Sequence, residues 1–339
     1  MKRPRKRRGI SAVLLVPVVM VACSTTGRLP SAVEVEAPTT TAGATPPAVE
    51  CPADQQLPDG VTQPSYAPDG PTPAPGKMPA GSTMAAIKAA GVLRVGISAD
   101  TLLFSSLDPQ DNVIKGFDVD VLLEVAKAIF AVDTEAEARQ HLDITVIPYR
   151  ERLPKLKADE VDLVAHTMTI NCVRWQQIAF SSEYFHAGQR VLVKVDSTYR
   201  TIDDLDSAGA TVCVPDGSTN QENLTAYPNA VAVVRTDISD CLVDLQQGQV
   251  EAITGDDTVL AGLAAQDPAT KVVGPQFSNE PYGLGVRADR VDFVKFVNSV
   301  IEDMRTDGRW AAIYETWLVP SLTDTVPDPP AARYGRTED

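Results

Sequence analysis

The chain has 339 residues, which leaves room for about two domains, each with a core of its own. Its 45 acidic residues outnumber its 30 basic residues, which gives a formal net charge of −15. An acidic surface argues against nucleic acid and anionic membranes as partners, and it cannot attract an anionic ligand. Any anion-binding site must therefore be built locally.

The N-terminus has the pattern of an export signal. Basic residues precede an apolar run from Ile10 to Val21, which is too short for a permanent membrane span. Small residues then lead to Cys23, and this stretch resembles a lipobox, with Met20 where Leu is more usual. We therefore expect residues 1–22 to be a lipoprotein signal peptide. An acylated Cys23 would hold the protein on the outer face of the cytoplasmic membrane; the alternative is a plain secretory signal with an incidental cysteine.

Two segments have the composition of disordered chain. Residues 23–81 hold 12 of the 26 prolines, with Thr, Ala and Gly between them and no apolar periodicity, so we expect a tether. Residues 321–339 are again proline-rich and predict a disordered tail. The folded part should therefore lie between about residues 82 and 320.

Four cysteines remain besides Cys23, and an exported chain keeps its disulfides. They allow three pairings, of which we favour Cys213 with Cys241 and Cys51 with Cys172. The first pair lies within one continuous segment, and closing a loop of that size could add on the order of 3 kcal/mol. A zinc site is the rival interpretation, but no C-x-x-C spacing or nearby His pair supports it. We expect neither a metal nor a cofactor.

Strands and helices alternate in the first part of the folded region. An apolar strand is expected at Leu93–Ile97, followed by a helix that Asp118 caps and that carries one apolar stripe. Further strands are expected at Ile144–Ile147 and Val161–Thr169, with a helix near Arg152–Lys157 between them. This alternation predicts an α/β fold with a mostly parallel sheet flanked by helices, whose ligands bind beyond the carboxyl ends of the strands.

A second α/β segment begins near residue 189. A strand at Thr211–Val214 leads into the glycine-hydroxyl turn Gly217-Ser218-Thr219, which is suited to an acceptor oxygen, and a strand at Val250–Thr254 ends beside Asp256. The chain then returns through "PYGLGV" to a long amphipathic helix.

One domain is thus inserted into another. We expect lobe I to comprise residues 82–188 plus 284–320, and lobe II residues 189–283. The two crossings between the lobes, near residues 186–192 and 280–286, predict a two-strand hinge with a cleft between the lobes.

The carboxyl end of the strand expected at Val161–Thr169 can hold a carboxylate. Thr167 and Thr169 place hydroxyls there, Asn171 occupies a helix N-cap position, and Arg174 falls in the first turn of that helix. The hydroxyls and the helix-start N–H groups donate hydrogen bonds, and Arg174 offers two parallel N–H groups to a planar anion.

Seven sequence motifs keep the order and spacing of a known family, and the match covers about residues 84–319. They are "LRVGISAD", "GFDVDVLLEVAKAI", "RLPKLKADEVDLV", "TMTINCVRWQQIAFSSEYF", "VPDGST", "VEAITGDD" and "DGRWAAIYETWL". Through them the chain resembles the family 3 extracellular solute-binding proteins, the polar amino acid receptors of ABC importers. Within the family it most resembles actinobacterial glutamine/glutamate-binding lipoproteins. The resemblance implies a two-lobed periplasmic-binding-protein type 2 fold, and we expect a monomer.

The resemblance also assigns roles to individual polar residues. Arg174 would bind the α-carboxylate of an amino acid, helped by Thr169 and by the turn at Ser218 and Thr219. Asp256, from the other lobe, would bind the α-ammonium. Because a zwitterion removed from water loses its hydration, both of its charges need partners of opposite sign.

Ligand selectivity depends on a second group of residues. Arg152 matches the position at which glutamate/aspartate binders place an arginine against the distal carboxylate, and Thr167 lies beside it. Ser98 replaces a charged contact residue common in relatives, and Thr101 stands where many carry a ligand-covering aromatic. Apolar amino acids therefore fit poorly. We expect an anionic or amide side chain, with glutamate and aspartate ahead of glutamine and asparagine.

Catalytic machinery is not indicated. The chain has three histidines, no G-x-S-x-G motif and no paired carboxylates beyond the adjacent Asp256 and Asp257, so we do not expect an enzyme. We expect a membrane-anchored extracellular receptor that delivers its amino acid to an ABC permease. The alternative is an amino acid sensor that presents its ligand-bound state to a membrane signalling partner, and the sequence does not separate the two.

Overall fold

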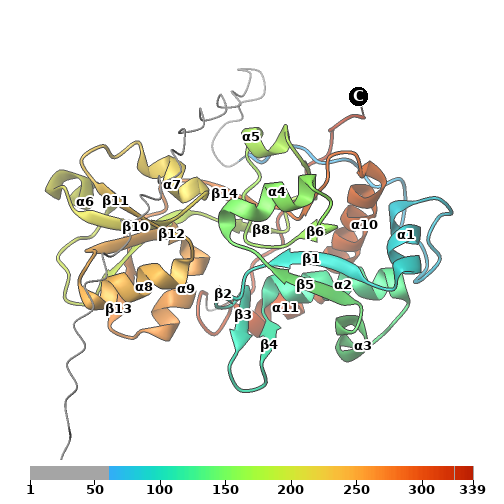
Figure 1. Ribbon diagram of the computed structural model, residues 1–339, viewed down its shortest axis with the longest axis horizontal. Coiled ribbons are helices and arrows are strands. Elements are labelled where there is room, and N and C mark those ends of the chain that lie inside the picture. Colours follow the sequence, from blue (N-terminus) through green and yellow to red (C-terminus); the bar gives the residue numbers. More distant parts are fainter. Residues whose placement is uncertain (1–60, 324, 339) are drawn as a thin grey trace, which may run out of the picture. The chain divides into compact units, whose positions relative to one another are not determined.

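The computed structural model describes residues 61–323 and 325–338, and the structural statements below concern these residues. The predicted signal peptide, the predicted lipid-anchor residue Cys23 and most of the predicted tether lie outside them. Within the described ranges, each helix is too short or too polar to cross a membrane. The chain forms two α/β lobes, as predicted, and each lobe is built on a five-stranded sheet (Figure 1).

The sheet of lobe I has the strand order β5-β1-β6-β15-β7. Its strands are β1 (Leu93–Ile97), β5 (Leu142–Val146), β6 (Leu163–Val164), β7 (Ala179–Phe180) and β15 (Gly285–Val286). β1 pairs in parallel with β5 and β6, whereas β15 runs antiparallel to both of its neighbours, so four strands point the same way. A separate antiparallel sheet consists of β2 (Asp100–Thr101), β3 (Ser105–Asp108) and β4 (Val113–Lys115).

Helices cover both faces of this sheet. They are α1 (Thr83–Ala90), α2 (Phe117–Phe130), α3 (Glu135–Arg139), α4 (Arg152–Lys157), α5 (Cys172–Trp175), α10 (Val291–Asp307) and α11 (Arg309–Trp317). On one face α2, α10 and α11 contribute Leu122, Val297 and Trp310 to the largest core cluster. On the other face Leu156 of α4 packs with Met168 in a smaller cluster. The predicted helix near Arg152–Lys157 is therefore confirmed.

The sheet of lobe II, coloured yellow and orange in Figure 1, has the strand order β11-β10-β12-β9-β13. Its strands are β9 (Gln189–Lys194), β10 (Thr211–Pro215), β11 (Val231–Arg235), β12 (Ala252–Asp256) and β13 (Thr270–Val273), and its helices are α6 (Ile202–Ala208), α7 (Thr219–Leu224), α8 (Ile238–Gln247) and α9 (Asp257–Gln266). β9 runs antiparallel to both neighbours, and the other strands share one direction. Side chains of a strand alternate between faces, so Val212 and Val214 pack with α6 while Cys213 packs with α8.

A two-strand hinge joins the lobes, as predicted. β8 (Phe185–Ala187) leaves lobe I and pairs antiparallel with β14 (Glu280–Tyr282), which leads back to it. Glu280 lies opposite Ala187, and Tyr282 lies opposite Phe185. The residues at the start of β14 therefore lie where both lobes can reach them.

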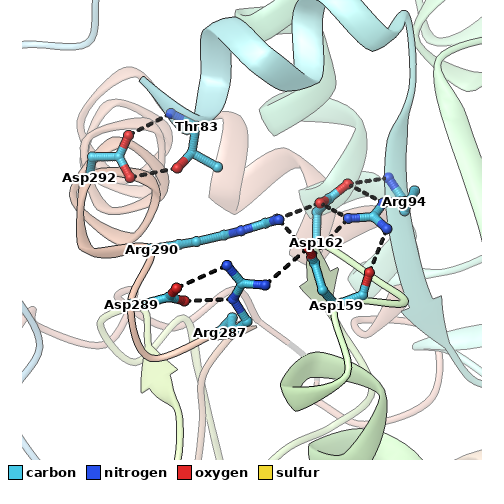
Figure 2. Close-up of polar contacts among 8 residues, drawn as sticks. All are labelled: Thr83, Arg94, Asp159, Asp162, Arg287, Asp289, Arg290 and Asp292. Carbon is cyan, nitrogen blue, oxygen red and sulfur yellow. Dashed lines mark hydrogen bonds and ion pairs between the residues drawn. The ribbon is translucent and has the colours of Figure 1, made fainter. Parts of the chain in front are cut away.

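An ion-pair network holds the returning chain on lobe I (Figure 2). Arg290, just before α10, donates to Asp159 at 2.6 Å and to Asp162 at 2.5 Å, both on the segment between α4 and β6. Arg94 of β1 donates to the same two carboxylates at 3.0 and 2.6 Å. Arg287 adds an ion pair to Asp159 at 3.0 Å. Two carboxylates thus connect a central strand to the start of the longest helix.

Two local predictions in lobe I were wrong. Asp118 does not cap α2, because Gly116 occupies the cap and Asp118 lies fully buried in the first turn. The strand predicted at Val161–Thr169 is confined to Leu163–Val164. Thr167 has a φ of 42°, which a strand cannot accommodate, and its N–H donates to the Asp118 carboxylate at 3.0 Å instead of to a neighbouring strand.

The residues before α1 and those at the C-terminus, predicted to be disordered, instead pack together on lobe I. Ser65 forms a parallel bridge with Tyr334, and the Ser65 N–H donates to the carbonyl of Arg333 at 2.9 Å. Asn298 of α10, which is fully buried, donates to the Ser65 hydroxyl at 2.8 Å and to the Tyr66 carbonyl at 2.7 Å. We call residues 61–66 together with 333–336 the terminal clasp.

The terminal clasp also contacts α5. The guanidinium of Arg336 lies 4.2 Å from the ring centroid of Trp175 and donates to the carbonyl of Ile178 at 3.0 Å. The Trp175 indole N–H donates to the carbonyl of Pro64 at 2.7 Å. The disorder prediction fails in the clasp because partners more than 260 residues apart in the sequence, such as Ser65 and Tyr334, satisfy its backbone and bury its side chains.

The predicted disulfide between Cys213 and Cys241 is confirmed. It joins β10 to α8 across 28 residues of sequence, and both cysteines are fully buried in the core of lobe II. Cys172 is also disulfide-bonded. Its predicted partner, Cys51, lies outside the described residues, so that pairing stays a prediction.

Candidate functional site

The first part of the site is the N-terminal turn of α5. As predicted, the Asn171 side chain caps this helix by accepting the N–H of Arg174 at 2.9 Å. The Arg174 guanidinium is buried and donates to the carbonyl of Thr169 at 3.1 Å and, across the lobe junction, to the carbonyl of Gly217 at 3.4 Å. Burial lowers the pKa of Arg174 from its usual value.

A second buried arginine lies nearby. Arg152, at the start of α4, is 2% exposed and donates to the carbonyls of Tyr149 at 2.9 Å and His166 at 3.1 Å. It also reaches the carbonyl of Gly217, at 3.3 Å, and its guanidinium lies 4.8 Å from the centroid of the Tyr149 ring. Burial, and then the positive charge of Arg174, lower the pKa of Arg152 to about 9.

Neither arginine is neutralised by a carboxylate within the described part of the chain. The ion pairs found there involve other cations, and the polar partners of Arg152 and Arg174 are backbone carbonyls. Removing a cation from water costs several kcal/mol unless an anion compensates it. Two such cations side by side therefore form a strong site for an anionic group.

Thr167 lies next to Arg152 in a strained backbone conformation. A positive φ costs a β-branched residue on the order of 1–3 kcal/mol, and such strain is concentrated at functional sites. The Asp118 carboxylate accepts a hydrogen bond from the Thr167 N–H, and the Arg152 guanidinium donates to the Thr167 carbonyl at 3.4 Å. The Thr167 hydroxyl is buried and has no hydrogen-bond partner among the described residues. It is therefore available to a ligand.

The acidic half of the site comes from lobe II. Asp256, at the end of β12, accepts the Asn220 amide at 2.7 Å and the Tyr282 hydroxyl at 2.6 Å. Burial, and then the negative charge of Glu280, raise its pKa to about 7. A bound ammonium would relieve both effects, because it would supply the opposite charge that the buried carboxylate lacks.

Glu280 is a functional candidate that the sequence analysis missed. Its carboxylate is 1% exposed and accepts the hydroxyls of Thr169 of lobe I and Thr219 of lobe II, each at 2.6 Å. It also accepts the Asn223 amide at 3.0 Å and the Ser278 hydroxyl at 2.5 Å. The available signal was an acid directly before the returning "PYGLGV" segment.

Two other predicted contact residues have their hydroxyls engaged locally. Ser98 donates to Asp100 at 2.7 Å and accepts the N–H groups of Asp100 and Thr101, at 3.1 and 3.2 Å. Ser218 caps α7 by accepting the N–H of Gln221 at 3.1 Å and donates to the carbonyl of Pro215 at 2.7 Å. Their roles in ligand binding stay predictions.

The lobes approach one another closely around these residues. Gly217 has a φ of 72°, and a Cβ atom there would lie 2.9 Å from the Cα of Arg150 in lobe I. A Cβ at Gly262 of α9 would lie 2.6 Å from the carbonyl oxygen of Leu102. An ion pair between Arg150 and Asp216 also spans the junction. Both glycines are needed for this close approach, since side chains there would clash with backbone.

These features define a two-lobed α/β binding protein with oppositely charged groups buried where its lobes meet. The family comparison agrees with this description. The chain belongs to the bacterial extracellular solute-binding proteins, family 3, whose family model matches residues 93–320.

Individual relatives support the same placement. The chain is 31% identical over 237 residues to the ABC transporter glutamine-binding protein GlnH of Bacillus subtilis, covering 70% of this chain and 84% of that protein. It is 32% identical over 206 residues to the glutamate-binding protein GluB of Corynebacterium efficiens, covering 58% and 69%. A crystal structure of a mutant of ArgBP from T. maritima matches with a TM-score of 0.62 and 31% identity, covering 69% of this chain and 98% of that one.

Proposed function

We propose that the protein is an extracellular receptor that binds a polar amino acid between its lobes and delivers it to an ABC importer. The observation that carries the proposal is the pair of buried, unneutralised arginines, Arg174 and Arg152, with the buried carboxylate of Asp256 nearby. Arg174 binds the α-carboxylate, and Asp256 binds the α-ammonium. Because these two residues come from different lobes, the ligand stabilises the closed arrangement of the protein.

We further propose that acidic amino acids, glutamate or aspartate, bind ahead of glutamine and asparagine. A dicarboxylate supplies one anion for each of the two arginines, whereas an amide leaves Arg152 without a counter-ion. The free hydroxyl of Thr167 offers a further hydrogen bond beside Arg152. The names of the relatives, which include both glutamine- and glutamate-binding proteins, are consistent with this ligand class.

An ABC permease is the proposed partner, rather than a membrane sensor, because a relative bears the name of an ABC transporter component. Attachment through an acylated Cys23 would keep the protein beside that permease. The relatives reported above carry the names of binding proteins, which supports binding rather than catalysis.

Isothermal titration calorimetry of the mature chain with Glu, Gln, Asp, Asn and Arg tests the proposal. The Arg174→Ala variant should weaken binding of every ligand by about 30-fold or more, because loss of a buried charged partner costs roughly 2–5 kcal/mol. Arg139→Ala is the matched control, since Arg139 pairs with Glu135 on α3 at 2.8 Å and should leave binding unchanged. The proposal fails if no amino acid binds the wild type, or if Arg174→Ala binds normally.

A further inference from the structure

Glu280 occupies the centre of a hydrogen-bond cluster that joins the two lobes through the hinge. One oxygen, Oε2, accepts both the Thr169 hydroxyl of lobe I and the Thr219 hydroxyl of lobe II, each at 2.6 Å. The other oxygen, Oε1, accepts the Asn223 amide at 3.0 Å and the Ser278 hydroxyl at 2.5 Å. Four groups of the described residues thus donate to this buried carboxylate.

This arrangement fixes the hydrogen-bonding character of the two threonines. A hydroxyl has one hydrogen to donate and two lone pairs that accept. Both threonine oxygens lie 2.6 Å from the same carboxylate oxygen and 3.3 Å from each other, so each hydrogen is donated either to Glu280 or to the other threonine and both are used within the cluster. Thr169 and Thr219 can therefore offer only lone pairs to a ligand. Lone pairs suit an ammonium, not the α-carboxylate to which the sequence analysis assigned these hydroxyls.

We infer that Glu280 is a specificity-determining residue that makes Thr169 and Thr219 acceptors and thereby selects ligands carrying a protonated α-amine. This inference rests on the proposed function and deepens it. Asp256 supplies the charge that opposes the ammonium, and the two threonine oxygens supply the remaining acceptors. The ligand α-carboxylate is left to Arg174 and is not held by the threonine hydroxyls.

The substitution Glu280→Gln tests this polarity without changing the shape of the side chain. Asn223 approaches Oε1 with an N–H donor, so the amide oxygen of the glutamine should keep that place. Its NH₂ group then faces Thr169 and Thr219 and donates to them, which turns their hydrogens toward the ligand. The threonines become donors, and a ligand ammonium meets hydrogens in place of lone pairs.

The measurement compares L-glutamate with glutarate, which has both carboxylates but no amine. In Glu280→Gln, the ratio of the glutarate Kd to the L-glutamate Kd should fall at least tenfold from its wild-type value, chiefly because L-glutamate binds more weakly. Glu315→Gln, an exposed change on α11, is the control and should keep the wild-type ratio. Equal loss for both ligands, or unchanged L-glutamate binding, would overturn the inference.

A second variant covers the case in which Glu280→Gln does not fold, as judged by circular dichroism. Thr219→Val removes one acceptor and should lower the same ratio, whereas an unchanged ratio contradicts the inference. The proposed function is tested separately by the wild type: if it binds no amino acid, that function fails. If the wild type binds and Arg174→Ala does not, but Glu280→Gln behaves as wild type, only the present inference fails.

Discussion

Replacing Arg152 by glutamine should change ligand selectivity, and the structure allows the size of the change to be worked out. The guanidinium is buried without a carboxylate partner, and its pKa is lowered to about 9 by burial and by Arg174. The distal carboxylate of bound glutamate would neutralise it. In Arg152→Gln that carboxylate stays buried without a cation, which costs roughly 2–5 kcal/mol, or about 30-fold to several thousandfold in affinity.

Glutamine should be affected much less by the same substitution. Its neutral amide loses one hydrogen bond, worth about 1 kcal/mol, or about fivefold in affinity. Titration calorimetry with both ligands measures the difference directly. Lys155→Gln is the control, because Lys155 lies on the same helix but pairs with Glu160 on the surface, at 2.5 Å. Equal losses for glutamate and glutamine in Arg152→Gln would refute the assignment of Arg152 to the distal carboxylate.

Three further predictions concern pH, the disulfide and the terminal clasp. Because the pKa of Asp256 is raised to about 7, the Asp256 carboxyl of the ligand-free protein is protonated below that pH. Affinity for the amino acid should therefore rise with pH up to about 7 and then become constant. At pH ~6, binding should release a proton, which calorimetry in buffers of different ionisation heat measures. Affinity that is constant from about pH 5.5 to 8 contradicts this. Replacing Cys213 and Cys241 together by serine should lower the free energy of unfolding by about 3 kcal/mol, measured by denaturant titration; no change would show that the link does not restrain the unfolded chain. Asn298→Ala should lower the free energy of unfolding by roughly 2–4 kcal/mol in the same assay, because it leaves the N–H of Ser182 and the Tyr66 carbonyl unpaired. A decrease under about 0.5 kcal/mol would exclude a stabilising role for the terminal clasp.

Features set by local pattern were predictable from the sequence. The helix at Arg152–Lys157 and the Asn171 cap depend on nearby residues, and the disulfide of lobe II joins cysteines 28 residues apart within one continuous segment; the structure has all three. The alternation of strands and helices likewise indicated two mostly parallel sheets. The hinge followed from the chain entering and leaving an inserted domain.

Features set by contacts between distant residues were not predictable. The strand expected to reach Thr169 stops at Val164, because Asp118, far away in the sequence, takes the N–H of Thr167. The terminal clasp depends on single residues from opposite ends, such as Ser65 and Tyr334, whose proline-rich surroundings resemble disordered chain. The sequence signal for Glu280 was weak, an acid directly before "PYGLGV", because its importance depends on hydroxyls from both lobes.

The central claim is that buried charges of opposite sign, from different lobes, bind one small dipolar molecule. Calorimetry of the wild-type mature chain with L-glutamate, glutarate and 4-aminobutyrate tests it most directly, because each analogue lacks one of the two α-charges. The account predicts that L-glutamate binds at one site and that each analogue binds at least about a hundredfold more weakly, a difference of about 2.8 kcal/mol. An analogue that binds as tightly as L-glutamate, or a protein that binds none of the three, would contradict it.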